Sequence, residues 1–320
     1  MTDLLRVAAV HLRTQRFELF AVLVVGVVAA LATTIEAARL QALAPSAACL
    51  LARFSGAGVS PPSCPSPDAF IAMDNREVAR LMAAMAVVPA IIGLLATSTL
   101  VSSEVEHRSA QLAWVLAPSR RRWLCERLLV AGGVLVVATS LAALGSLALE
   151  RVRVPWFDPG ASFADFGLSG PLVLARAIAF AGLGLLAGAV TGRQVPAVIT
   201  GAMAITLLFL ALSALMPYGL PAVPIRIDGP PGASLLTGIR FRAPDGTLIT
   251  YSEVVQRAPP GLDDDARIDW IDEHYPGVSI GLPASEAPQV ALREGALLGA
   301  VAVTSVAGSF VVVGRRRPYP

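Results

Sequence analysis

Charged side chains are sparse in this 320-residue chain, and one group of them stands out between residues 101 and 127. The segment reads VSSEVEHRSAQLAWVLAPSRRRWLCER and lies between two long apolar runs. Exposed carboxylates and guanidinium groups can set the register of a contact with another protein, and an apolar side chain beside them can anchor it. The residues with these properties are Glu104, Glu106, Arg108, Leu112, Trp114, Arg120, Arg121, Arg122 and Trp123.

A second motif has the letters of a hydrolase nucleophile. Residues 277–281 read GVSIG and match the GxSxG elbow, with Asp272 and His274 close by. The elbow needs a strand, a turn and a helix in a large parallel sheet, and its histidine follows the serine in the chain. Here the histidine precedes Ser279 and the surrounding segment is short. We therefore interpret residues 277–281 as an ordinary glycine-serine turn.

Few residues in this chain could support other kinds of catalysis. The sequence contains no lysine, so neither a GxxxxGK[ST] phosphate loop nor a lysine Schiff base can form. Its three histidines, at positions 11, 107 and 274, make no HExxH pair. We expect no catalytic residue, no metal site and no cofactor bound by the chain itself.

The composition is that of a membrane protein. Hydrophobic residues make up 55% of the chain, charged residues only 15%, and the mean hydropathy is +0.67. A helix needs about 20 apolar residues to cross a bilayer, because only intrahelical bonds satisfy its backbone there. The apolar runs predict an all-α polytopic fold with six transmembrane helices, over residues 19–35, 81–101, 128–149, 172–191, 195–215 and 295–313.

Arginine density predicts the orientation of these spans. Placing both termini in the cytoplasm puts the short, arginine-rich segments 1–18, 102–127 and 314–320 inside, as the positive-inside rule requires. The longer segments 36–80, 150–171 and 216–294 then lie outside, and they hold most of the acids. We expect a multi-pass plasma-membrane protein whose basic face meets anionic lipid, with no role in nucleic-acid binding.

The first cytoplasmic segment, residues 1–18, has a helical pattern. Leu4, Leu5, Ala8 and Leu12 recur at helical spacing among arginines, which predicts an amphipathic helix on the inner membrane surface. The alternative is a frayed basic tail.

Two cysteines lie in the first outer segment. Cys49 and Cys64 flank a proline-rich stretch, and an oxidising compartment favours a disulfide between them. Two unpaired thiols remain the alternative. Cys125 begins the third span on the inner side and is expected to stay reduced.

The largest outer segment, 216–294, changes abruptly to proline, glycine and aspartate. Residues 239–251 alternate apolar and polar side chains around the turn Pro244-Asp245-Gly246, which predicts a β-hairpin. Three aspartates at 263–265 suit the start of a short helix. We expect a small α+β extracellular domain.

Few charges fall inside or beside the spans. Arg176 in the fourth span and Arg293 and Glu294 before the sixth are expected near the outer surface, where long side chains can reach water. The spans then offer no buried acidic relay of the kind that ion-driven transport uses. Any substrate held among them is expected to be hydrophobic or amphipathic.

The cytoplasmic segment resembles a known family. A pair of acids after the second span, then Leu112-Ala113-Trp114, then residues 118–123 (PSRRRW) leading into the third span, resembles permease subunits of ABC type-2 exporters, most closely those of high-GC actinobacteria. A second likeness is Pro283-Ala284-Ser285, which leads towards Glu294 and the last span. Arg108-Ser109 departs from the usual Gly-Thr step of that family.

The resemblance implies that the membrane passage and the ATP hydrolysis belong to separate subunits. Residues 102–127 would form a coupling-helix hairpin that docks into a separate ABC ATPase, which binds ATP and Mg²⁺. Docking would use Glu104, Glu106, Arg108, Leu112 and Trp114, while Arg120, Arg121, Arg122 and Trp123 would anchor the hairpin at the membrane interface. The permease, not itself an enzyme, would dimerise with its own copy or with another permease and export the substrate.

Two other functions stay open at this point. An ATPase-independent secondary transporter or channel would share the six spans, although the missing acidic relay argues against it. A membrane-anchored sensor or assembly protein would present residues 216–290 outside and transport nothing.

The paired cysteines give the first testable prediction. Cys49 and Cys64 should resist alkylation until a reductant is added, and reduction should shift the mobility of the chain on a gel. Cys125 serves as the control, since its thiol should react throughout once the membrane is permeabilised. Alkylation of all three thiols without reductant would show that the disulfide is absent.

Overall fold

A computed structural model of the chain describes residues 15–46, 49, 68–107, 119–153, 162–215, 217–225 and 234–316. Within these ranges, six helical runs are long and apolar enough to cross a membrane, which confirms the predicted all-α polytopic fold. They are α2 (Arg16–Leu43), the run from α4 (Asp68–Met73) through η1 (Asp74–Val78), α5 (Ala79–Met85) and α6 (Val88–Glu106), then α8 (Arg120–Arg153), α9 (Pro171–Thr191), α10 (Gln194–Leu215) and α13 (Ala287–Arg315). The predicted surface helix at residues 1–18 lies almost wholly outside the described residues.

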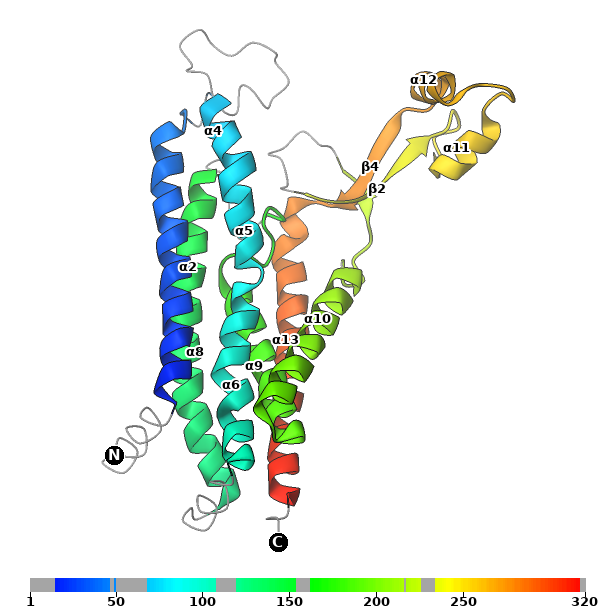
Figure 1. The fold of residues 1–320 in the computed structure, drawn as a ribbon. Coiled ribbons are helices and arrows are strands. Elements are labelled where there is room, and N and C mark those ends of the chain that lie inside the picture. Colours follow the sequence, from blue (N-terminus) through cyan, green and yellow to red (C-terminus); the bar gives the residue numbers. More distant parts are fainter. Residues whose placement is uncertain are drawn as a thin grey trace.

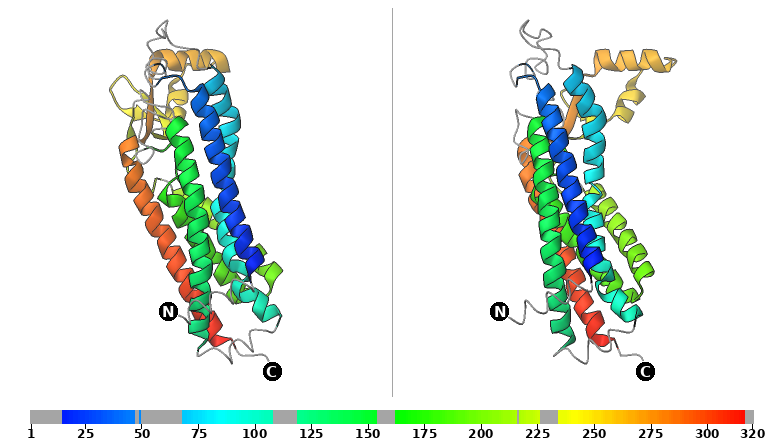
Figure 2. Two further views of the ribbon diagram at one scale, coloured as in Figure 1. Left: turned by 90° about the vertical axis from the view of Figure 1, so that its left-hand side faces the viewer. Right: turned by 60° about the vertical axis from the view of Figure 1, so that its left-hand side comes forward.

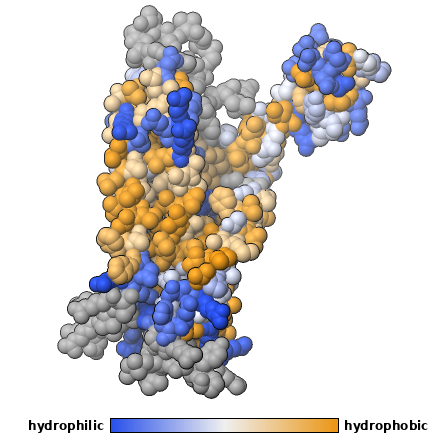
Figure 3. Space-filling model, viewed as in Figure 1, coloured by the Kyte–Doolittle hydropathy of each residue, from blue (hydrophilic) through white to orange (hydrophobic). Residues whose placement is uncertain are grey.

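The spans form one bundle with two unlike ends (Figure 1). We call the end where α6 stops and α8 starts the hairpin end, because residues 108–118 connect the two helices there. The opposite end, to which the small sheet is attached, is the arm end. Figure 3 shows apolar side chains around the middle of the bundle and hydrophilic ones towards both ends, as a bilayer-spanning surface requires.

The second membrane run is longer than the bilayer needs. Asp68–Glu106 has 39 residues, which at a rise of about 1.5 Å each is far more than the ~30 Å of hydrocarbon. Pro89 near the start of α6 marks the break from α5. Residues 68–80, expected as loop, are helical because Phe70 and Val78 pack with Leu40 and Leu149 in an apolar cluster.

Small residues let the helices of the bundle approach closely. A Cβ on Gly26 of α2 would lie 2.5 Å from the carbonyl oxygen of Ala138 on α8. On α8, a Cβ on Gly145 would lie 2.3 Å from Thr33 Oγ1 and 2.9 Å from Ala30 Cα, both on α2. These two glycines therefore fix the spacing of α2 and α8, since an ordinary side chain would push the backbones apart.

The turn between α9 and α10 also depends on a glycine. Gly192 follows Thr191 with a φ of +64°, the left-handed conformation that ends many helices, and its N–H donates to Gly188 O. Only two residues separate the two spans, which are therefore antiparallel neighbours.

The predicted small α+β domain is present between α10 and α13, and we call residues 223–282 the arm. Its antiparallel sheet has the order β1-β4-β2-β3, formed by β1 (Val223–Pro224), β2 (Leu235–Arg242), β3 (Leu248–Ile249) and β4 (Gly277–Leu282). The expected hairpin is confirmed as β2 paired with β3. The arm leads away from the ends of α10 and α13, and Figure 1 and the right-hand view of Figure 2 show it leaning out from the bundle.

Two short helices complete the tip of the arm. The expected helix is α12 (Asp264–His274), which Asp263 caps by accepting from the N–H of Ala266. Tyr251, expected in a strand, instead begins α11 (Tyr251–Arg257). There Thr250 and Glu253 form a reciprocal capping box, and this hydrogen bonding lowers the pKa of the Glu253 carboxyl.

The interpretation of residues 277–281 as a turn is wrong. They form most of β4, a central strand that pairs with β1 on one side and β2 on the other. Ser279 lies opposite Ile239 in that ladder. A serine in the middle of an antiparallel strand has no elbow geometry, so the structure also removes the hydrolase alternative.

Gly145 and Gly133 of α8 offer a matched pair for testing the close packing. Gly145→Ala should lower stability by about 1 to 3 kcal/mol, because its methyl group would meet the backbone of α2. Gly133→Ala should leave stability unchanged or slightly raised, since nothing among the described residues lies within 4 Å of its Cβ. Equilibrium denaturation in mixed micelles measures both, and equal effects would contradict the packing described.

Candidate functional site

The hairpin end carries the residues expected to meet a partner. Arg108, Leu112 and Trp114 lie outside the described residues, so their role stays a prediction. The residues on both flanks are described: Glu104 and Glu106 close α6, and Arg120, Arg121, Arg122 and Trp123 open α8. The contacts of these flanking residues show which helices would move if a partner displaced residues 108–118.

Glu104 is tied to α8 by an ion pair. Its carboxylate accepts from the guanidinium of Arg127, whose Nη1 also donates to Leu100 O at 3.3 Å. Arg127 is only 5% exposed, and its guanidinium lies 4.7 Å from the centre of the Trp123 ring. A buried arginine is tolerated only when it is paired and hydrogen-bonded, so this contact holds the end of α6 against α8.

Trp123 differs from its predicted role. It was expected as an anchor at the membrane interface, yet it is 5% exposed and packs with Leu100, Val101 and Leu124 in an apolar cluster. The reason is its place on α8, since the ring lies on the face that packs towards α6 and supports Arg127. Arg121 and Arg122 are exposed, as an interface position requires.

Glu106 reaches a different helix. Its Oε2 accepts from the backbone N–H of Gln194 at 2.8 Å, and Gln194 is the first residue of α10. The N-terminus of a helix has unsatisfied N–H groups and a partial positive charge, both of which favour a carboxylate there. Glu106 therefore connects the end of α6 to the start of α10.

Arg120 connects the other flank to the last span. Its Nη1 donates to Arg316 O at 2.5 Å and to Val313 O at 3.5 Å, where α13 ends. Arg316 in turn donates to Val190 O near the end of α9, at 3.0 Å. A guanidinium at helix C-termini satisfies free carbonyls and complements their partial negative charge. Movement of residues 108–118 would therefore act on α8, α10 and α13 together.

The arm end holds a second charged cluster, and here a prediction is wrong. Arg176 and Glu294 were expected to extend to water, but they are 8% and 1% exposed. Arg176 Nε donates to Glu294 Oε1 at 2.8 Å, which joins α9 to α13. The pair is buried because each residue supplies the counter-charge that the other lacks in an apolar surrounding.

Three further contacts surround that pair. Arg176 Nη1 donates to Gly167 O at 2.9 Å, and the hydroxyl of Tyr218 donates to Glu294 Oε2 at 3.2 Å. Arg293 Nη1 donates to Tyr218 O at 2.5 Å. Burial, and then the nearby Glu294 carboxylate, raise the pKa of Tyr218 well above its usual range. The tyrosine therefore stays protonated and keeps donating at any ordinary pH.

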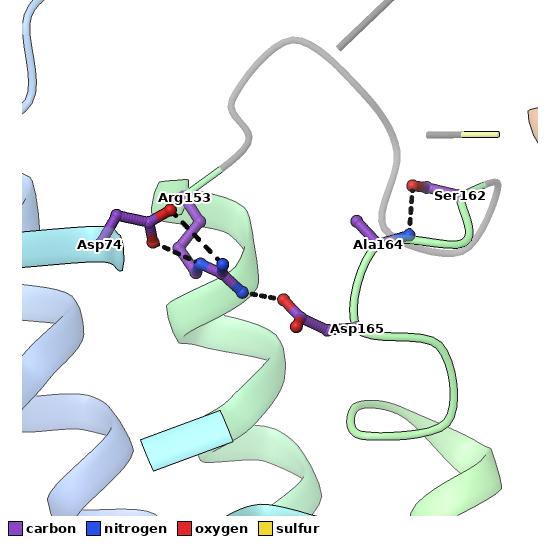
Figure 4. A network of polar contacts seen from close by, with 5 residues as sticks. All are labelled: Asp74, Arg153, Ser162, Ala164 and Asp165. Atoms are coloured by element: carbon purple, nitrogen blue, oxygen red, sulfur yellow. Dashed lines mark hydrogen bonds and ion pairs between the residues drawn. The ribbon is translucent and has the colours of Figure 1, made fainter. Parts of the chain in front are cut away.

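A network beside this cluster holds the ends of other helices (Figure 4). Arg153 at the end of α8 donates from Nε to Asp74 Oδ1 at 2.5 Å, on the π-helix η1, and from Nη1 to Asp165. Ser162 accepts from the N–H of Ala164 at 3.0 Å in the same loop. The loop 162–170 is thus held by Arg153 at Asp165 and by Arg176 at Gly167.

The chemistry of both clusters is structural. They consist of ion pairs and helix caps, and no group of histidine, cysteine or acidic residues among the described positions could hold a metal ion. Cys125 is a free, exposed thiol, whereas Cys49 is disulfide-bonded, and its predicted partner Cys64 lies outside the described residues. Because these contacts join different helices, a displacement of one helix can be passed to another.

Among the described residues, six helical runs are long and apolar enough to cross a membrane and charged contacts join them at both ends, as in a multi-pass membrane protein. Comparison with known protein families identifies the family to which this membrane protein belongs. Residues 19–218, more than half of the chain, match the family described as "ABC-2 membrane transporter related", and the chain belongs to that family. No curated protein and no solved structure matches the chain.

Arg127 and Arg122 give a test of the ion pair at the hairpin end, since both are arginines of α8 paired with an acid. Arg127→Met should cost about 3 to 5 kcal/mol, because it leaves Glu104 charged and unpaired in a place where its side chain is only 15% exposed. The double change Arg127→Met with Glu104→Leu should recover most of that loss. Arg122→Met should cost less than about 1 kcal/mol, since its pair with Glu126 is exposed.

Denaturation in mixed micelles gives these three free energies. A loss for Arg127→Met as small as that for Arg122→Met would show that the pair does not hold α6 to α8.

Proposed function

We propose that the chain is the membrane-spanning permease subunit of an ATP-binding-cassette exporter in the plasma membrane. A separate ATPase supplies the energy and docks on the hairpin 102–127 at the cytoplasmic side. The substrate is hydrophobic or amphipathic. The permease acts as a dimer, with a second copy or with another permease.

One observation carries this proposal. The two flanks of residues 108–118 do not end freely but are joined to other spans, by Glu106 to α10 and by Arg120 to α13. A partner that moves the segment would therefore also move these two spans. Such a linkage suits alternating access driven from outside the membrane, in which rigid helices switch between two packings.

The energy source follows from what the chain contains. A chain without lysine has no phosphate-binding loop of the GxxxxGK[ST] type, so the nucleotide belongs to the partner. The ion pairs described within the bundle, Glu104 with Arg127 and Arg176 with Glu294, occupy charges that an ion-driven transporter would need free. The spans otherwise offer apolar surface, which supports a substrate of matching character.

The orientation rests on arginine. The hairpin end collects Arg120, Arg121, Arg122, Arg193 and Arg315, and the positive-inside rule favours the cytoplasm for that end. The arm then lies outside.

Trp114 tests the docking of the ATPase. Trp114→Ala should leave the chain in the membrane yet lower co-purification of the ATPase subunit about tenfold or more, as expected for loss of an aromatic anchor. Trp114→Phe is the matched control, because it keeps a ring in the same place and should retain most of the ATPase. The same preparations in liposomes should differ likewise in ATP hydrolysis stimulated by an amphipathic dye.

Unchanged co-purification and hydrolysis with Trp114→Ala would contradict the proposed docking. Dye movement driven by an ion gradient alone, without an ATPase, would favour a secondary transporter. A chain that associates with no ATPase and moves no dye would favour a sensor or assembly protein.

A further inference from the structure

We infer that the outer exit of the transport path opens between α9, α10 and α13, and that Arg176, Glu294 and Tyr218 form a latch that closes it. The inference rests on the proposed function, in that the arm end is the outer end. It gives a role to Arg176, Glu294 and Tyr218, which lie at the opposite end of the bundle from the segment proposed to dock the ATPase.

The latch joins the three helices where they meet. Arg176 lies on α9, Glu294 on α13, and Tyr218 in the turn after α10. α10 and α13 both pack on α9, and through Tyr218 and Glu294 they are also joined to each other. Separating α10 from α13 at this end therefore requires breaking the hydrogen bonds that join Tyr218 to Glu294 and to Arg293.

Apolar clusters lie on both sides of the latch. On the bundle side, Ala179, Leu212 and Leu298 pack together, one residue from each of the three helices. On the arm side, Phe163 packs with Leu282 and Val290, and Leu235 at the start of β2 lies against them. Tyr218 packs against both clusters. A charged layer packed between two apolar layers closes the space between the three helices at this end.

The arm is joined to the latch at both of its ends. The chain leaves α10 through Tyr218, forms the arm, and returns into α13 just before Glu294. Leu235 and Leu282, which root its two main strands, belong to the cluster directly outside the latch. A substrate leaving between α10 and α13 would have to displace the root of the arm, so the arm and the latch open together.

The cost of opening is set by the ion pair. Arg176 and Glu294 have little access to water, and a separated pair would leave two charges in an apolar surrounding. The closed state is therefore strongly favoured unless the helices are driven apart together. We expect the pair to make opening depend on the ATPase cycle.

Accessibility of a buried position measures the latch directly. Ala179 is fully buried and lies one helical turn from Arg176, on the bundle side of the latch. Ala179→Cys, in a chain with Cys125→Ala, is exposed to a membrane-impermeant maleimide from the arm side. The same chain with Ala179 retained gives the background.

The latch variant carries Arg176→Ala and Glu294→Ala together, so that no unpaired charge is left buried and no apolar side chain takes the place of the pair. Labelling of the introduced cysteine should become about tenfold faster, which corresponds to losing about 1.4 kcal/mol of closure. The matched control carries Glu36→Gln and Arg39→Gln, an exposed ion pair within α2, and should label as slowly as the parent. Equal labelling of the latch variant and this control overturns the inference.

A conservative variant guards against misfolding of the double change. Arg176→Lys keeps the charge but loses the planar fork that holds Glu294 and Gly167 at once. It should label at a rate between the parent and the double variant, and no increase counts against the latch.

The two proposals fail separately. In the parent chain bound to its ATPase, ATP should raise labelling of the cysteine at 179, and this result supports both. Faster labelling of the latch variant without any effect of ATP in the parent keeps the latch and contradicts the proposed coupling. An ATP effect in the parent with no effect of the latch variant keeps the coupling and overturns the latch.

Discussion

A charge buried in an apolar surrounding needs an opposite charge, and the two most buried arginines among the described residues pair with acids on other helices. Arg127 of α8 pairs with Glu104 of α6, and Arg176 of α9 pairs with Glu294 of α13. Apolar side chains in a bilayer supply little preference for one neighbour over another, because lipid tails satisfy them equally well. The ion pairs therefore specify which helices meet, and glycines such as Gly145 set how closely they do.

The same constraint explains how α13 can link the two ends. At the hairpin end its last carbonyls accept from Arg120, and at the arm end Glu294 is held by Arg176 and Tyr218. An α-helix between two such attachments moves as a rigid element, so displacement at one end appears at the other. The chain belongs to the ABC-2 membrane transporter related family, and under the proposed function this geometry would carry a displacement from one side of the membrane to the other.

The sequence predicts the features that depend on local composition. The six apolar runs, the hairpin β2–β3 and the helix α12 follow from hydropathy, turn residues and an aspartate cap, and the structure contains all of them. α11 was missed although its signal is visible, since Thr250 and Glu253 have the spacing of a capping box. The strand over residues 277–281 was misread because glycine and serine favour turns, and only its pairing with β1 and β2 overrides that preference.

The pairing of distant charges could not be predicted. Arg176 and Glu294 are 118 residues apart, and nothing in the local sequence indicates that α9 and α13 are neighbours. The contact of Glu106 with Gln194 and the burial of Trp123 are likewise properties of the assembled bundle. In each case the residue type was noticed, and its partner depended on tertiary packing.

The central claim is that nucleotide chemistry in a partner changes the spacing of α10 and α13 at the arm end. Leu215 and Leu292 are exposed, 56% and 74%, near the arm-side ends of these helices, and each can carry a spin label. Pulsed electron paramagnetic resonance then gives the distance between them in the complex with the ATPase. We predict that trapping the ATPase with nucleotide and vanadate changes this distance, and that Glu106→Ala reduces the change. An unchanged distance in a complex that hydrolyses ATP would contradict the account.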